Sequence, residues 1–117
     1  MGEQTVSPRL LEANLFSRSA AQLQRIRDDW ENGADGLHAA LTFNRRLWNI
    51  FLNSVTGEAS QLPKQLRENV ANLGIFVMKH TLATKPRPEA RKLDVLININ
   101  RELAAGLRAS AEVMDRK

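Results

Sequence analysis

Few side chains of this sequence are of the types that carry out chemistry. The 117 residues contain two histidines, His38 and His80, and no cysteine. Metal ligands usually come in groups along one helix face or one loop, and no such group surrounds either histidine. His80 falls near the apolar face of a predicted helix, so we interpret it as a hydrogen-bonded core histidine. The sequence therefore predicts no metal site.

Motifs that bind phosphates or activate a nucleophile are also missing. The chain has no G-x-S-x-G, no P-loop and no G-x-G-x-x-G. Gly74 and Gly106 lie within predicted helices, where close helix packing explains them better than phosphate binding. The paired acids Asp28 and Asp29 fall on an exposed flank and are expected to be solvated. We predict a protein that is not an enzyme and has no cofactor.

A basic run, "KHTLATKPRPEARK" at 79–92, is the best candidate for nucleic-acid binding. A basic loop can contact phosphates. It has no helix-turn-helix spacing beside it, and the net charge of the whole chain is only +4. We therefore interpret the run as a solvated loop and do not predict a nucleic-acid partner.

The composition fits one globular domain over 1–117 with flexible ends. Hydrophobic residues make up 43% of the chain and charged residues 26%, close to the globular average. We find no signal peptide and no apolar span of the ~20 residues that a membrane helix needs. The absence of cysteine suits a reducing cytoplasm, so a cytoplasmic location without membrane contact is the expectation.

The positions of proline and glycine divide the chain into four helical segments. Pro8 suits the first helical turn, and Asn32-Gly33 predicts the end of the first helix. The second helix is expected from Asp35 to Gly57, the third from Leu62-Pro63 to the "KPRP" run, and the fourth from about Glu89 to Met114. Strand signals are poor. The expected fold is all-α, an antiparallel up-and-down bundle of about four helices with short loops.

Two asparagines interrupt the apolar faces of the second and fourth helices. At 100° per residue, Asn44 falls at the centre of the stripe of the second helix, and Asn100 at the centre of that of the fourth. Both are predicted to be buried, and a buried carboxamide needs a hydrogen-bond partner. We expect them to bond to each other or to a backbone carbonyl. The adjacent Arg45 and Arg101 lie at the margins of the stripes, and Arg46 points nearly opposite.

The second and third helices carry more apolar surface than a four-helix core requires. Phe43 and Ile50 widen the apolar arc of the second helix, whereas Ile75, Met78 and Leu82 fall on the far side of the third. In the first helix, the core stripe is expected to contain Leu11, Leu15, Ile26 and Trp30, with Phe16 and Leu23 on one flank. Surplus apolar surface usually marks an interaction site. A homodimer contact is the alternative interpretation.

In order along the chain, "SPR", "ALTFNRRLWNIFL", "LPKQLRENVANLGIFVMKHTL" and "LININRELAAGL" resemble the FlaF family of flagellar biosynthesis regulators of alphaproteobacteria. The resemblance covers 7–108. It is specific in the succession N-R-x-L-W, L-P-x-x-L-R and I-N-R-x-x-A-x-G-L. The chain departs from the family pattern in having no tyrosine in the lead-in and Leu10 where an acidic residue is expected.

The resemblance implies a non-enzymatic, cytoplasmic role in flagellum assembly. FlaF-like proteins act on flagellin, supporting its synthesis or its export, alongside a partner regulator called FlbT. The implied mechanism is chaperone-like, since flagellin's amphipathic terminal segments need cover before export, and a helical protein can supply it by helix-in-groove binding. The alternative is a post-transcriptional regulator that contacts flagellin messenger RNA directly or through FlbT.

The residues of interest divide by role. Asn44 and Asn100 are predicted to organise the bundle. Arg45 and Arg101 are predicted either to meet acidic groups of the partner or to tie neighbouring helices together, and Arg46 is the clearest candidate for a charge contact. Candidates for the apolar contact are Phe43, Ile50, Ile75, Met78 and Leu82.

Overall fold

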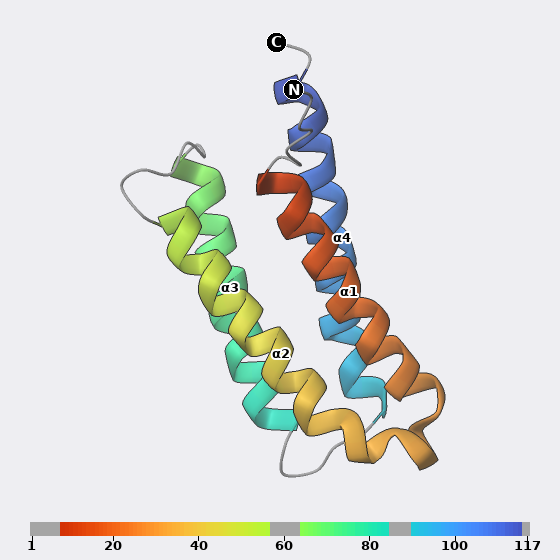
Figure 1. The fold of residues 1–117 in the computed structure, drawn as a ribbon. Coiled ribbons are helices and arrows are strands. Elements are labelled where there is room, and N and C mark those ends of the chain that lie inside the picture. Colours follow the sequence, from red (N-terminus) through yellow and green to blue (C-terminus); the bar gives the residue numbers. More distant parts are fainter. Residues whose placement is uncertain (1–7, 57–63, 85–89, 116–117) are drawn as a thin grey trace.

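The computed structural model describes residues 8–56, 64–84 and 90–115, without the side chains of Pro8, 33–35, Leu66, 82–84 and 112–115. These residues form four α-helices, and none of them lies in a strand. The helices are α1 (Pro8–Asp28), α2 (Trp30–Thr56), α3 (Lys64–Thr84) and α4 (Ala90–Asp115). Figure 1 shows them packed against one another, which confirms the predicted all-α bundle.

The boundary between α1 and α2 lies at a single residue, Asp29, and not at Asn32-Gly33 as predicted. The Asp29 N–H still donates to the Arg25 carbonyl at 3.2 Å, while the Asp29 carbonyl accepts from the Asn32 N–H at 3.1 Å. The Asn32 amide also donates to the Asp29 carboxylate at 3.0 Å. These bonds supply partners at the start of α2, so the helix begins before Gly33 and continues through it. The other boundaries lie within a few residues of the predicted ones.

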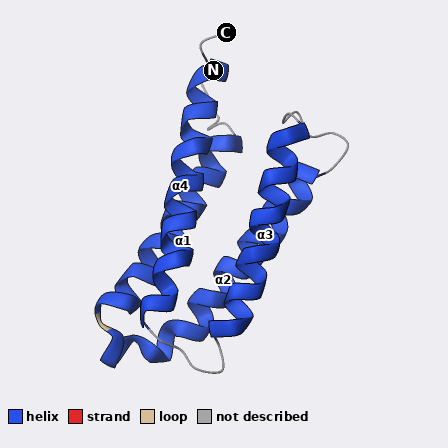
Figure 2. Ribbon diagram, turned by 180° about the vertical axis from the view of Figure 1, so that it is seen from behind, coloured by secondary structure: helices blue, strands red, loops and turns tan. Residues whose placement is uncertain are grey.

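The bundle consists of two antiparallel pairs. In Figures 1 and 2, α1 lies along α4 and α2 lies along α3. The pairs are joined through the packing of α1 against α2, while α3 and α4 touch at only a few positions. The Cα radius of gyration is 15.3 Å, larger than the ~13 Å expected for a compact chain of this length. Because α3 and α4 are the least packed of the four neighbouring helix pairs, the seam between them is the open side of the bundle.

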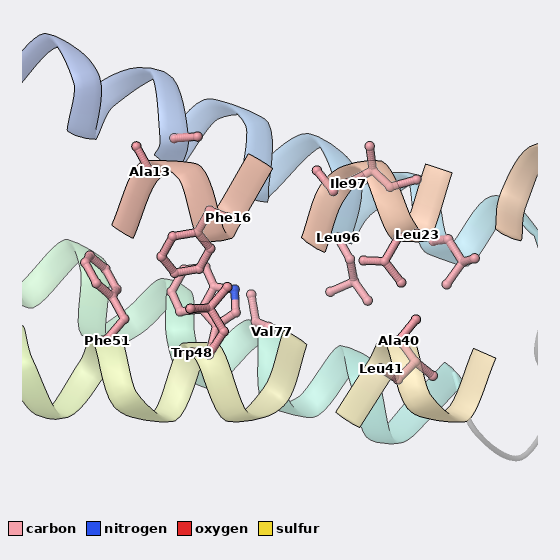
Figure 3. Packing of buried hydrophobic residues seen from close by; sticks show 14 of the residues in the cluster. Ala13, Phe16, Leu23, Ala40, Leu41, Trp48, Phe51, Val77, Leu96 and Ile97 are labelled. Carbon is pink, nitrogen blue, oxygen red and sulfur yellow. The ribbon is translucent and has the colours of Figure 1, made fainter. Parts of the chain in front are cut away.

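Three aromatic rings hold α1 against α2 at the centre of the core (Figure 3). Phe16 of α1 lies 5.2 Å from Trp48 and 5.1 Å from Phe51, and both pairs are edge-to-face. Trp48 and Phe51, which are both buried, are themselves 6.0 Å apart and nearly perpendicular. Such pairs add about 0.5–1.5 kcal/mol each beyond the burial of their surface.

The buried face of α1 differs from the predicted one. Leu11 and Leu15 are 51% and 39% exposed, whereas the core positions are mostly small or aromatic: Ala13, Phe16, Ser19, Ala20, Leu23 and Ile26. Because α1 packs against both α4 and α2, its buried arc is set by two neighbours and centres on Phe16 and Leu23. Of the predicted stripe, Ile26 is buried as expected, whereas the predicted flank of Phe16 and Leu23 forms the centre of the buried arc.

A buried hydrogen-bond network joins α1, α2 and α4. The Asn100 amide donates to the Asn44 carbonyl oxygen at 2.8 Å, and the Ser19 hydroxyl donates to the same oxygen at 3.0 Å. The Trp48 indole N–H donates to the Asn100 carbonyl oxygen at 3.0 Å. All four side chains are completely buried. The predicted burial of both asparagines is confirmed, and of the two expected partners, each other or a backbone carbonyl, the structure shows a bond to each other.

The Trp48 indole determines how the two carboxamides are oriented. An indole N–H can only donate, so the Asn100 carbonyl must face Trp48 and the Asn100 amide must face Asn44. The Asn44 carbonyl is then turned toward Asn100, and the Asn44 amide nitrogen is buried without a hydrogen-bond partner in the described part of the chain. An unpaired buried donor costs about 1–3 kcal/mol. The network therefore specifies which helices meet more than it stabilises them.

The glycines of α3 and α4 have different surroundings. A Cβ at Gly74 of α3 would lie 2.6 Å from a methyl of Leu52 in α2, so this glycine lets the two helices approach closely, as predicted. A Cβ at Gly106 of α4 would meet nothing within 4 Å. The prediction of close packing is wrong for Gly106, which is exposed on the surface of α4.

Replacing Asn100 by leucine should destabilise the fold by about 1–3 kcal/mol, because the Trp48 N–H would become a second unpaired buried donor. The free energy of unfolding is measurable by guanidinium denaturation followed by circular dichroism. In the double variant Asn44→Leu/Asn100→Leu, the loss should be smaller than the sum of the two single losses. Each single substitution leaves the remaining asparagine without its hydrogen-bond partner, and the double variant removes both asparagines. Strictly additive losses would show that the asparagines do not interact.

Alanine at the two glycines should have effects of opposite sign. Gly106→Ala should raise the free energy of unfolding by about 0.5–1 kcal/mol, because alanine is the better helix former and the space is open. Gly74→Ala should lower it by about 1–3 kcal/mol through overlap with Leu52. The Gly74 penalty should shrink in a Leu52→Ala background. Equal effects at the two positions would contradict the structure.

Candidate functional site

The exposed apolar side chains predicted to form one contact surface lie on different faces. Ile50 of α2 is 69% exposed and Ile75 of α3 is 54% exposed. Leu52, which meets Gly74 of α3, is two positions from Ile50, so Ile50 points away from α3. Ile75 is two positions from the fully buried Val77 and therefore points out of the bundle. The structure does not bring Ile50 and Ile75 together.

The other predicted apolar candidates are less accessible. Phe43 and Met78 are half-buried and pack against the core cluster, so Met78 does not lie on the far side of α3 as expected. Met78 is one turn from Gly74, and the contact of Gly74 with Leu52 draws this side of α3 against α2. The side chain of Leu82 lies outside the described residues.

An open groove lies between α3 and α4, where the two helices diverge. It has a volume of about 270 Å³, and its apolar lining is formed by Val70 and Leu73 of α3 and by Ile99 and Leu103 of α4. Asn69 and Glu102 are its polar lining residues. Leu73, Ile99 and Leu103 pack against the core on one side and face the groove on the other. This is an apolar surface with few polar groups, as expected of a site that captures another apolar segment.

Phe76 and His80 continue this side of α3. Phe76 is 47% exposed and stacks on the His80 ring at 5.7 Å with an interplanar angle of 16°. The Nε2 atom of His80 lies 2.7 Å from the Lys92 carbonyl oxygen of α4, so it donates a hydrogen bond there. This bond joins the C-terminal part of α3 to the first turns of α4. Phe76 was not among the residues singled out from the sequence, although it precedes His80 by one helical turn.

The three motif arginines have different surroundings. Arg46 is exposed, as predicted, whereas Arg45 is half-buried. The Arg101 guanidinium donates to the Gln24 side-chain oxygen of α1 at 3.1 Å. For Arg101 the structure thus shows one of the two predicted roles, a tie between neighbouring helices.

Arg101 belongs to a row of polar contacts along α1 and α4. Residues seven apart on α4 face α1: Asp94 meets Arg27, Arg101 meets Gln24, and Arg108 donates to Ser17 at 2.9 Å. Seven-residue spacing keeps side chains on one seam between two helices that run side by side, here in antiparallel directions. Sequence reasoning missed this row, although the spacing of Asp94, Arg101 and Arg108 indicates it.

The ion pair in this row is short and exposed. Arg27 Nε lies 2.6 Å from Asp94 Oδ1, and Nη2 lies 3.3 Å from Oδ2. This hydrogen bonding lowers the pKa of Asp94 and raises the pKa of Arg27. A lowered carboxyl pKa adds stability above the pKa of the unfolded state, and that stability is lost as the pH falls through the folded-state pKa. Both side chains are about 40% exposed, so solvent screening keeps the contribution small.

Within 8–56, 64–84 and 90–115, no three histidine, aspartate or glutamate side chains come together as metal ligands would. Within the same ranges, no helix is both long and apolar enough to cross a membrane. Part of the basic run, 85–89, lies outside the described residues. A larger pocket of about 310 Å³ lies at the turn between α1 and α2, and its lining is mostly polar: Gln22, Arg25, Ile26, Asp29, Asn32 and Gly36. The groove between α3 and α4 differs from it in having mainly apolar walls.

Comparison with known proteins agrees with the motif order. The family model described as "Flagellar protein FlaF" matches residues 1–107. No curated protein and no solved structure matches the chain. The chain is a member of the FlaF family of flagellar proteins.

Proposed function

We propose that this flagellar protein binds flagellin as a non-enzymatic, chaperone-like factor. In this role it acts in the cytoplasm and promotes the synthesis and secretion of flagellin during filament assembly. FlbT is a further proposed partner. Membership of the FlaF family supports the flagellar setting. The observation that carries the proposal is the divergence of α3 from α4, which leaves the core leucines of both helices facing an open groove.

Apolar capture fits this surface better than phosphate binding does. The groove has four apolar lining side chains and one charged side chain, the acid Glu102. The carboxylate at the rim repels a phosphate backbone, whereas covering the apolar walls with a partner lowers the free energy. Phe76, at nearly half exposure, adds apolar surface on the same side of α3.

Purified wild-type protein should bind purified flagellin in isothermal titration calorimetry, and the affinity should change little between ~50 and 200 mM salt. Phosphate contacts would instead lose orders of magnitude over that range. Binding to flagellin messenger RNA in place of flagellin, with such a salt dependence, would overturn the proposal in favour of the post-transcriptional alternative.

Phe76→Asp should weaken flagellin binding about 4–10-fold, because full burial of an aromatic side chain is worth ~1.5–3 kcal/mol and Phe76 has about half of its surface left to bury. The melting temperature should fall slightly, because the variant loses the stacking of Phe76 on His80, while circular dichroism should show an unchanged helix content. Ile50→Asp is the matched control, since Ile50 is still more exposed but points away from α3. A larger loss from Ile50→Asp or Arg46→Glu than from Phe76→Asp would move the contact to α2 and refute the groove as the site.

A further inference from the structure

The shape and lining of the groove suit the binding of a helix. Its walls are two antiparallel helices, and its apolar side chains repeat at helical spacing, Val70 with Leu73 on α3 and Ile99 with Leu103 on α4. A helix that lies between two others buries one apolar stripe against both walls. The other three helix pairs of the bundle are already packed, so this seam is the one that an added helix would close.

The surface of α4 beyond the groove contains several small exposed residues. Gly106 lies seven residues after Ile99 and one turn after Glu102, so it continues the same face. It is exposed, as are its neighbours Ala105 and Ala109. A glycine inside a helix costs about 0.5–1 kcal/mol relative to alanine. No contact within the described structure explains the missing side chain, because a Cβ there would meet nothing within 4 Å.

The charge at the groove indicates what the occupant carries. Glu102 is the one charged lining residue, and it is exposed at the rim. A lysine or arginine of the occupant can pair with this carboxylate while its apolar stripe covers the walls. A second copy of this chain fits less well, because a two-fold contact centred on the groove would bring two Glu102 carboxylates toward each other.

We propose that the α3–α4 groove binds one amphipathic helix of a partner chain. The apolar stripe of that helix packs on Leu73, Ile99 and Leu103, one of its lysines or arginines pairs with Glu102, and its backbone passes close to α4 at Gly106. The assignment of this helix to flagellin rests on the proposed function. The preference of the groove for an amphipathic helix with a basic residue is independent of the proposed function.

Two synthetic helical peptides of about 18 residues test the groove independently of flagellin. Both carry leucines at i, i+3/i+4 and i+7, and they differ only in a lysine or a glutamate beside that stripe. By fluorescence anisotropy at low salt, full-length wild-type protein should bind the lysine peptide about 2–5-fold more tightly, as expected for an exposed ion pair. Glu102→Lys should reverse the preference, whereas Glu31→Lys, an exposed charge change on α2, should leave it unchanged.

Gly106→Leu should weaken both peptides about 10-fold or more, because its side chain occupies the path of the bound helix. The open space around Gly106 predicts an intact fold, which circular dichroism and the melting temperature check. Ala21→Leu is the matched control, since Ala21 is a small exposed residue of α1 on the face opposite its core contacts. Equal affinity for both peptides, or no effect of Gly106→Leu, would overturn the proposal.

Two further outcomes separate the groove from the client. If the wild type sediments as a dimer that Gly106→Leu converts to a monomer, a second copy fills the groove and the proposal fails. Loss of flagellin binding in Gly106→Leu, with competition by the lysine peptide, supports a flagellin helix as the occupant. Unchanged flagellin binding overturns that assignment and leaves the proposed function standing. If the wild type does not bind flagellin, the proposed function is overturned. The peptide experiment then still shows whether the groove binds an amphipathic helix that carries a basic residue.

Discussion

The buried hydrogen-bond network of Ser19, Asn44, Trp48 and Asn100 is the constraint on which the rest of the bundle depends. Apolar packing is tolerant of shifts in register, but a buried donor or acceptor that loses its partner costs about 1–3 kcal/mol. The network therefore admits one arrangement of α1, α2 and α4. The aromatic contacts of Phe16 with Trp48 and Phe51 are made at the same level of α2 and reinforce that arrangement.

The third helix takes no part in this network, and its attachment differs accordingly. Gly74 allows close contact with Leu52 of α2, and His80 reaches the Lys92 carbonyl of α4 near one end of the helix. Between α3 and the middle of α4 there is no comparable polar tie among the described residues. The buried polar bonds hold α1, α2 and α4 together, whereas α3 is held mainly by its packing against α2. The seam between α3 and α4 is therefore left open, and the candidate site lies in that seam.

Much of the architecture follows from the chain's local chemistry. Proline positions and apolar periodicity predicted the four helices. The 100° placement of Asn44 and Asn100 predicted their burial, while their bond to each other was one of two expected solutions. The candidate contact residues were less predictable. Phe43 and Met78 are partly covered, and Ile50 and Ile75 point in different directions, because a helical wheel shows where a side chain lies on its own helix and not which neighbour covers it.

The sequence by itself determined the fold class, the buried polar pair and the family, because each depends on residue types at short spacings along the chain. Only the tertiary structure decided which arc of α1 is buried, what surrounds Gly106 and where the apolar surface opens. These features depend on the relative placement of whole helices, which residues distant in sequence set together. The exposed Leu11, the unfilled space at Gly106 and the groove between α3 and α4 all follow from α1 packing against two neighbours while α3 packs chiefly against one.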